Sequence, residues 1–158
     1  MGGDVAAGSG QVLTVHDYPD TSFLASLYGE DGNSVAAVAE CGRQKSRLMI
    51  TPLAEFELVN AFGARVFRKE SNAAQAGASV RAFEADLASG LFVRRAVSGS
   101  AYERALSLSR KYTPLLGTRA MDILHVAIAL ELGAAAFLTF DQAQRRLAHA
   151  AGMKVRPK

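Results

Sequence analysis

The sequence predicts an α/β domain in which helices cover both faces of a central, mainly parallel sheet. Short β-rich segments alternate with longer segments of helical periodicity along the 158 residues, and strands separated by helices usually pair in parallel. Hydrophobic residues make up 49% of the chain and charged residues 21%, a composition typical of a globular protein with a buried core. No internal repeat or interior linker interrupts the pattern. A single three-layer α/β/α sandwich is therefore expected.

The first half of the chain is predicted to contain a strand at 12–19, helices at 20–28 and 33–43, a strand at 47–51, and helices at 52–69 and 72–89. The first strand ends in Pro19, which suits a strand end or edge. The second helix should be closed by Gly42, and Pro52 fits the first turn of the third. In the fourth, apolar residues recur at spacings of four, three and four between Ala76 and Leu87, which indicates one helical face.

The second half is predicted to contain a strand at 90–97, helices at 100–113 and 118–133, a strand at 135–140, a helix at 141–152 and a last strand at 154–156. Ser100 begins the first of these helices, and Gly133 is the expected C-terminal stop of the second. Asp141 provides an N-cap for the third.

Several classes of protein can be set aside from composition alone. Residues 1–11 lack the basic and apolar regions of a signal peptide, so they are interpreted as a flexible leader before a single domain over 12–158. No apolar run reaches the roughly 20 residues that span a bilayer, so no membrane association is expected. The single cysteine, Cys41, excludes an internal disulfide and fits a reducing cytoplasm. The net charge of +3 is compatible with a polyanionic partner but does not demonstrate one.

Acidic residues occur where functional groups gather in open α/β sheets, at the carboxyl ends of strands. Asp20 and Asp141 each follow a predicted strand, and Asp122 lies in the first turn of a predicted helix. Glu55 and Glu57 lie in the first turns of the helix after 47–51. Converging carboxylates are costly unless a cation compensates them. Oxygen ligands without paired histidines or cysteines favour Mg²⁺ or Mn²⁺, and such a metal can promote phosphodiester hydrolysis.

Three blocks of the sequence resemble those of PIN-domain proteins of the VapC toxin type: YPDTSFLASLY, TPLAEFELVNAF and TRAMDILHVAIALELGAAAFLTFDQAQRRLAHAAGMKV. The resemblance extends from about Val12 to Val155 and keeps the order and spacing of the blocks. It implies a three-layer domain with a Mg²⁺-dependent ribonuclease site. It also implies a protein that is commonly a homodimer and is often held inactive by a cognate antitoxin.

The same resemblance assigns four acidic positions of the family. The first falls on Asp20, the third on Asp122 and the fourth on Asp141. The second falls on Glu57, which starts the ELVNA segment, with Glu55 as the alternative. These four carboxylates would bind one or two metal ions, directly or through water, and RNA would be the substrate.

Simpler interpretations exist for each residue. Asp20 and Asp141 could be N-caps alone. His125 is interpreted as a partly buried residue bonded to backbone rather than as a metal ligand. Hydroxyls of Thr21, Ser22 and Thr139 could position water or phosphate, although capping explains them equally well. A phosphate-holding rim could be drawn from basic residues, although most of them are more simply a solvated surface and Arg119 is the first to test: Arg65, Arg68, Lys69, Arg81, Arg94, Arg95, Arg110, Lys111 and Arg119.

Two other function classes remain open. A receiver-like domain also binds Mg²⁺ in an acidic pocket and accepts a phosphoryl group. It would need paired acids after the first strand, where YPDTS offers one, and a late lysine where FLTFDQ has Asp141. The other is a non-catalytic PIN-fold interaction module. Apolar segments 23–28 and 59–67 could form a dimer or antitoxin surface, or equally the core.

Overall fold

The computed structural model describes residues 15–43 and 46–158, and in this part of the chain short parallel strands lie between two groups of helices. The predicted leader, and residues 12–14 of the first predicted strand, lie outside the described residues. The elements in chain order are β1 (Tyr18–Pro19), α1 (Thr21–Tyr28), α2 (Ser34–Arg43), β2 (Leu48–Ile50), α3 (Pro52–Phe67), α4 (Ala73–Ala88), β3 (Phe92–Arg94), α5 (Gly99–Leu116), α6 (Ala120–Glu131), β4 (Phe137–Leu138), α7 (Gln142–Ala150) and β5 (Val155–Arg156).

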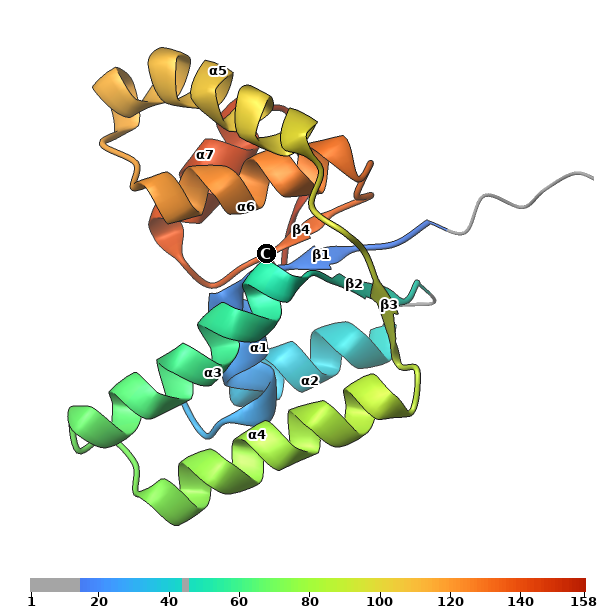
Figure 1. The fold of residues 1–158 in the computed structure, drawn as a ribbon, viewed down its shortest axis with the longest axis vertical. Helices are drawn as coiled ribbons and strands as arrows, with labels where there is room; N and C mark the ends of the chain where they lie inside the picture. Colours follow the sequence, from blue (N-terminus) through green and yellow to red (C-terminus); the bar gives the residue numbers. More distant parts are fainter. Residues whose placement is uncertain (1–14, 44–45) are drawn as a thin grey trace, which may run out of the picture.

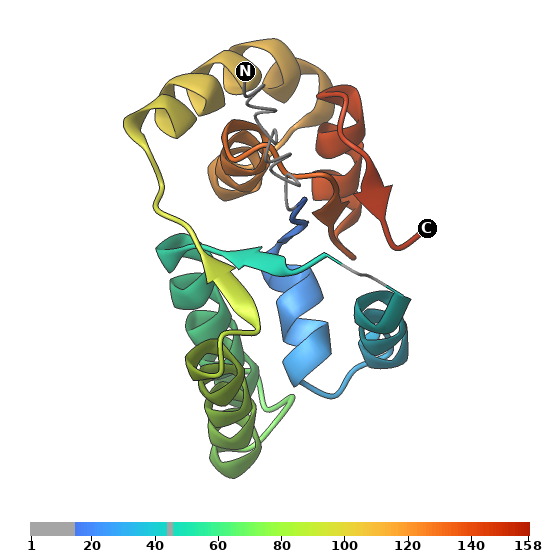
Figure 2. The same ribbon diagram turned by 90° about the vertical axis from the view of Figure 1, so that its right-hand side faces the viewer.

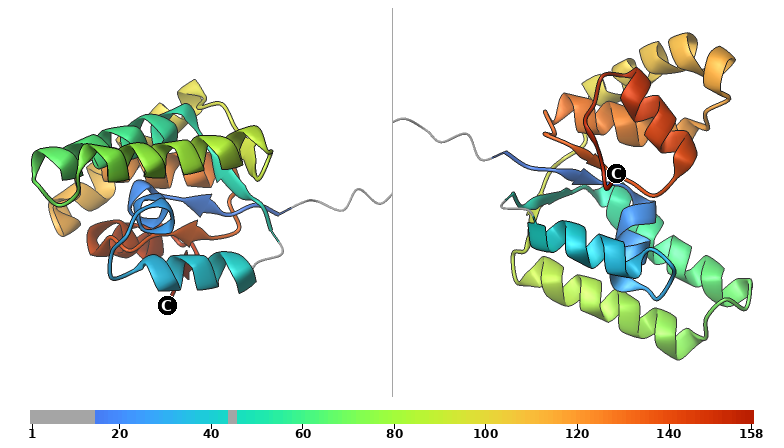
Figure 3. Two further views of the ribbon diagram at one scale, coloured as in Figure 1. Left: turned by 90° about the horizontal axis from the view of Figure 1, so that it is seen from below. Right: turned by 180° about the vertical axis from the view of Figure 1, so that it is seen from behind.

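Every strand pair among the described residues is parallel, in agreement with the predicted mainly parallel sheet. One sheet has the order β1-β4-β5 and the other pairs β2 with β3. An isolated parallel bridge between Asp17 and Leu48 joins the two sheets. Helices α5, α6 and α7 lie on one side of the strands, and α1 to α4 lie on the other (Figure 1). The predicted three-layer α/β/α architecture is therefore confirmed. Helices α3 and α4 run side by side along the second layer (Figure 2 and Figure 3).

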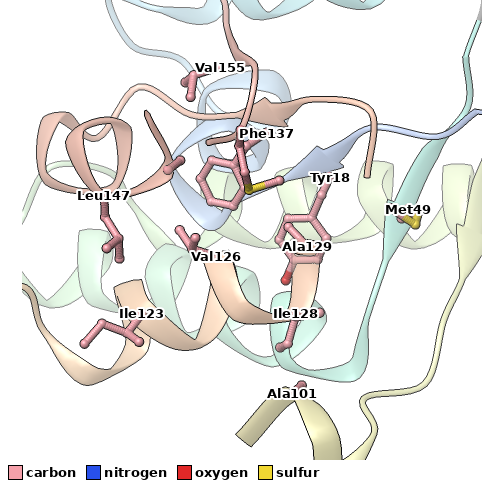
Figure 4. Packing of buried hydrophobic residues seen from close by; sticks show 12 residues of the cluster. Tyr18, Met49, Ala101, Ile123, Val126, Ile128, Ala129, Phe137, Leu147 and Val155 are labelled. Carbon is pink, nitrogen blue, oxygen red and sulfur yellow. The ribbon is translucent and has the colours of Figure 1, made fainter. Parts of the chain in front are cut away.

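Separate apolar clusters hold each helical layer against the strands. Figure 4 shows the cluster beneath α6 and α7, where Val126 and Leu147 pack against Phe137 of β4 and Tyr18 of β1. The opposite cluster joins α3 and α4 to the second sheet through residues such as Phe83. Because each fully buried large side chain stabilises the fold by about 1.5–3 kcal/mol, these two clusters fix the strand ends where the acidic residues lie. No helix in the described part of the chain is both long and apolar enough to cross a membrane.

Several boundaries differ from the sequence-based prediction. The helix expected to begin at Ser100 begins at Gly99 with Ser98 as its N-cap, and the strands expected at 90–97 and 135–140 are Phe92–Arg94 and Phe137–Leu138. The first strand ends at Pro19 as predicted, because Pro19 has no N–H to donate and Asp20 already caps α1; in the described residues it begins at Tyr18, after an isolated bridge at Asp17. Helix α2 continues through Gly42 to Arg43, so Gly42 does not close it. Helix α5 passes Pro114 and ends at Gly117, whose φ of 62° is left-handed. One backbone hydrogen bond lost at Pro114 is tolerated in a last turn that packs Leu116 against the core.

Candidate functional site

Asp20 is the most enclosed of the predicted acids. It follows β1, has no exposed surface, and is the N-cap of α1. Its Oδ1 accepts hydrogen bonds from the backbone N–H of Phe23 at 2.8 Å and from the Ser22 hydroxyl at 2.7 Å. Its Oδ2 accepts a hydrogen bond from the Thr139 hydroxyl, which lies just after β4. Capping and membership of a polar cluster are therefore compatible roles for one carboxylate.

Asp141 is joined to Asp20 through two hydroxyls. The backbone N–H of Asp141 donates to Thr139 Oγ1 at 2.9 Å and to Ser22 Oγ at 3.2 Å, and both hydroxyls also contact Asp20. The Asp141 side chain divides its oxygens: Oδ1 caps α7 by accepting from Gln144 N–H at 2.8 Å, while Oδ2 lies 3.7 Å from Arg119. The predicted capping role of Asp141 is confirmed, and its second oxygen faces the guanidinium of Arg119.

Glu57 approaches the same region from α3. Its Oε2 accepts a hydrogen bond from the Thr21 hydroxyl at 2.6 Å and a second from Nε2 of His125. Thr21 is the residue after Asp20, and His125 is one helical turn beyond Asp122. Because these two donors lie beside the other predicted acids, Glu57 is attached to their cluster although it comes from a different helix.

Asp122 lies in the first turn of α6 and is 4% exposed. Arg119, the N-cap residue of this helix, donates to Asp122 Oδ2 at 2.9 Å and to Oδ1 at 3.4 Å. The Arg119 side chain is 74% exposed, so the guanidinium covers the carboxylate from the solvent side. Since it also contacts Asp141, Arg119 is a shared counterion for two of the four acids.

Burial and hydrogen bonding shift the acids in opposite directions. Burial raises the pKa of Asp20 to about 6, against hydrogen bonds from Thr139, Phe23 and Ser22 that lower it. The hydrogen bond from His125 lowers the pKa of Glu57 below its usual value, assisted by Thr21. Asp20 is therefore a carboxylate whose charge is poorly compensated by the surrounding protein, and a nearby cation would relieve that cost.

The alternative second acid, Glu55, is not part of this cluster. It pairs with Arg94 at 3.5 Å, whereas Glu57 contacts Thr21 and His125. Residues two apart on a helix face different directions, so one of the two glutamates had to point away from the other acids. The geometry favours Glu57.

Two interpretations made from the sequence, those of His125 and of the basic rim, need correction. His125 is 1% exposed and bonds to side chains, Tyr18 and Glu57, rather than to backbone. The broad basic rim is also reduced, since Arg65, Arg68 and Arg94 are committed to ion pairs with neighbouring acids. Sequence reasoning did not single out Tyr18 as a site residue. For its partner His125, the sequence signal was the spacing of three residues from Asp122.

The chemistry of the donors fits a hard divalent cation such as Mg²⁺. The four carboxylates carry oxygen ligands, and the adjacent hydroxyls of Ser22, Thr21 and Thr139 add further oxygens. Within residues 15–43 and 46–158, no three acidic, histidine or cysteine side chains are close enough to bind one ion together. Mg²⁺ usually keeps several waters and uses one or two carboxylates directly, so a hydrated ion suits this spacing.

The fold and these contacts define a parallel α/β domain with acidic residues from four segments linked at one edge of its strands. The PIN domain family model matches residues 18–150, and the chain belongs to this family. The comparison with curated proteins finds no match.

Solved structures with the same fold are distant in sequence. VapC20 of Mycobacterium tuberculosis, described as a sarcin-ricin loop cleaving toxin, is 20% identical with a TM-score of 0.67, over 89% of this chain and 98% of that one. VapBC-1 of nontypeable Haemophilus influenzae is 16% identical with a TM-score of 0.62, over 90% and 97%. FitAcB of Neisseria gonorrhoeae is 16% identical with a TM-score of 0.63, over 89% and 96%. At these identities the similarity concerns the fold.

Proposed function

We propose that this protein is a Mg²⁺- or Mn²⁺-dependent endoribonuclease. The observation that carries the proposal is the linkage of the four acids: Thr139 and Ser22 connect Asp20 to Asp141, and Arg119 connects Asp141 to Asp122. Glu57 joins through residues adjacent to Asp20 and Asp122. Membership of the PIN domain family and the fold shared with VapC20 support the proposal.

The chain's residues would divide the work of such a reaction. Asp20, Glu57, Asp122 and Asp141 would hold the divalent ion, directly or through water. When bound, the ion would lower the pKa of a water and neutralise charge on the scissile phosphate. Ser22 and Thr139 hold the carboxylate of Asp20 in one rotamer, and the exposed guanidinium of Arg119 is placed to contact a phosphate oxygen.

Cleavage of RNA by the purified chain tests the proposal directly. We expect cleavage with Mg²⁺ or Mn²⁺, none with a chelator, and loss of cleavage in Asp20→Asn with the fold intact by circular dichroism. An Asp20→Asn variant as active as the wild type would remove this acid from the mechanism. If neither metal supports cleavage of any RNA tested, the non-catalytic PIN-fold module becomes the better account.

The phosphoacceptor alternative has less support. A receiver-like site needs paired acids after the first strand and a lysine after a late strand, but Asp20 alone follows β1 directly and Asp141 stands after β4. Labelling with a small phosphodonor separates the two functions. We expect no label on the protein.

We further propose a toxin of a type II toxin–antitoxin pair that acts in the cytoplasm, inhibited by a cognate antitoxin and assembled as a homodimer. The resemblance to VapC-type proteins supports the antitoxin. Exposed apolar side chains on α3, namely Phe56, Val59 and Phe67, support an additional protein contact, whereas residues 23–26 of the other apolar segment are buried. Light scattering measures the oligomeric state, and co-expression with the neighbouring gene product tests inhibition.

A further inference from the structure

The carboxylate of Glu57 is held by only one of its two oxygens. The hydroxyl of Thr21 and Nε2 of His125 both contact Oε2, and no hydrogen bond reaches Oε1 from the residues that the structure describes. Two donors on one oxygen fix the rotation of the carboxylate. Its other oxygen therefore keeps its lone pairs for a ligand outside the protein.

A directed chain of hydrogen bonds leads to this contact. The Tyr18 hydroxyl lies 2.8 Å from Nδ1 of His125 and can donate to it. With Nδ1 accepting, the proton of a neutral imidazole is on Nε2, where it is donated to Glu57.

The two side chains of this hydrogen-bond chain, Tyr18 and His125, are enclosed by the core and have little freedom to rearrange. Tyr18 is 0% exposed and His125 is 1% exposed. The ring of Tyr18 stacks on Phe137 with centroids 5.8 Å apart and meets the imidazole edge-on at 5.8 Å.

We propose that Tyr18 and His125 are positioning residues, which hold Glu57 through Oε2 so that Oε1 is presented to a divalent cation or its bound water. The inference rests on the proposed function, because it assumes that Glu57 serves a metal. It gives His125 a role through Glu57 and not as a metal ligand. Hydrogen bonds to metal-binding carboxylates and their partners commonly change metal affinity by about 10- to 100-fold.

The first test is the affinity of the purified full chain for Mn²⁺ alone, measured by calorimetry. We expect His125→Phe to weaken Mn²⁺ binding by about 10- to 100-fold, Tyr18→Phe to weaken it less, and His125→Gln, which keeps an N–H donor, to restore part of the loss. Tyr28→Phe is the matched control, since it removes a tyrosine hydroxyl that donates to Asp86 at 2.7 Å in a different contact. If His125→Phe binds Mn²⁺ as well as Tyr28→Phe does, the proposal is overturned.

Epistasis with Glu57 separates positioning from general packing. In the Glu57→Gln background, His125→Phe should cause no further loss of Mn²⁺ affinity, because the group that it orients is gone. A full additional loss would show that His125 acts elsewhere and would refute the proposal. The proposed function fails separately: in that case Asp20→Asn and Glu57→Gln would bind Mn²⁺ like the wild type.

A second measurement uses the wild-type protein without metal, so it does not depend on whether a substituted protein folds. Long-range ¹H–¹⁵N NMR of the wild-type protein at neutral pH reports which imidazole nitrogen carries a proton. We expect Nε2 of His125 to carry a proton. A proton on Nδ1 with none on Nε2 would leave Glu57 without its donor and would overturn the proposal.

Discussion

Replacing Asp20 with asparagine should stabilise the metal-free protein at neutral and alkaline pH while it abolishes RNA cleavage. Asparagine cannot ionise, keeps the shape of the side chain, and is among the best N-cap residues. The variant therefore removes the buried charge and keeps the cap of α1 through its amide oxygen, while it loses the hydrogen bond that Oδ2 accepts from Thr139. Function and stability would then change in opposite directions at one residue.

The size of the effect follows from the pKa of Asp20. This pKa is raised from 3.8 to about 6 by burial, so between these two values the folded state binds more protons than the unfolded state. Stability is consequently lost as the pH rises through the folded pKa. About two pKa units correspond to an upper limit of about 3 kcal/mol, and we expect Asp20→Asn to recover about 1–3 kcal/mol at pH values above 7.

Urea unfolding in the presence of a chelator measures this gain across the pH range. Near pH 4 the wild-type and variant proteins should have nearly the same free energy of unfolding. Asp31→Asn is a control of opposite sign. Burial raises the pKa of Asp31, but hydrogen bonds from Asn33, Arg65 and Ser26 together outweigh it and lower the pKa overall, so this variant should lose stability as the pH rises. An Asp20→Asn protein that is equally destabilised at low and high pH would refute the reasoning.

Three further predictions concern other parts of the cluster and the core. Glu57→Gln should reduce RNA cleavage at least about 100-fold, whereas Glu55→Gln should leave it near the wild-type rate; equal losses in cleavage assays would refute the assignment. Arg119→Gln should tighten Mn²⁺ binding, because the guanidinium no longer competes for Asp122 and Asp141, yet should slow cleavage; calorimetry that shows weaker binding would contradict this. Phe83→Ala, in a core cluster away from the acids, should cost about 3–5 kcal/mol in urea unfolding without changing Mn²⁺ affinity, and a changed affinity would show that the site depends on distant packing.

The architecture could be read from the sequence because periodicity and capping are local. The strand ending at Pro19, the Pro52 start of α3 and the Gly133 stop all depend on neighbouring residues. Boundaries failed where a distant contact outweighed the local signal. Pro114 suggests the end of a helix, but packing of Leu116 and the left-handed Gly117 prolong α5 by one turn.

For the site, Asp20, Asp141 and Asp122 could be expected near one edge of the strands because each follows a strand or lies in the first turn of a helix; Glu57, in the second turn of α3, is assigned from the family resemblance. Their connections could not be predicted, since the Tyr18 to His125 hydrogen bond spans 107 positions and the His125 to Glu57 contact spans 68. Only the folded chain shows that a histidine with no sequence-evident function lies between two polar partners. The choice of Glu57 over Glu55 likewise depends on which way α3 faces.

Anomalous diffraction from a crystal of this protein soaked in Mn²⁺ tests the central claim most directly. The account predicts a peak beside the four acids, with the ion bound directly to at least one carboxylate oxygen at about the 2.0–2.1 Å typical of Mg²⁺ and with Oε1, rather than Oε2, of Glu57 facing the ion or its water. Arg119 should then have moved away from Asp122. The contradicting result would be a crystal saturated with Mn²⁺ in which the anomalous peak lies elsewhere and Arg119 still pairs with Asp122 and Asp141. That result would rule out a metal-dependent nuclease site at this edge of the strands.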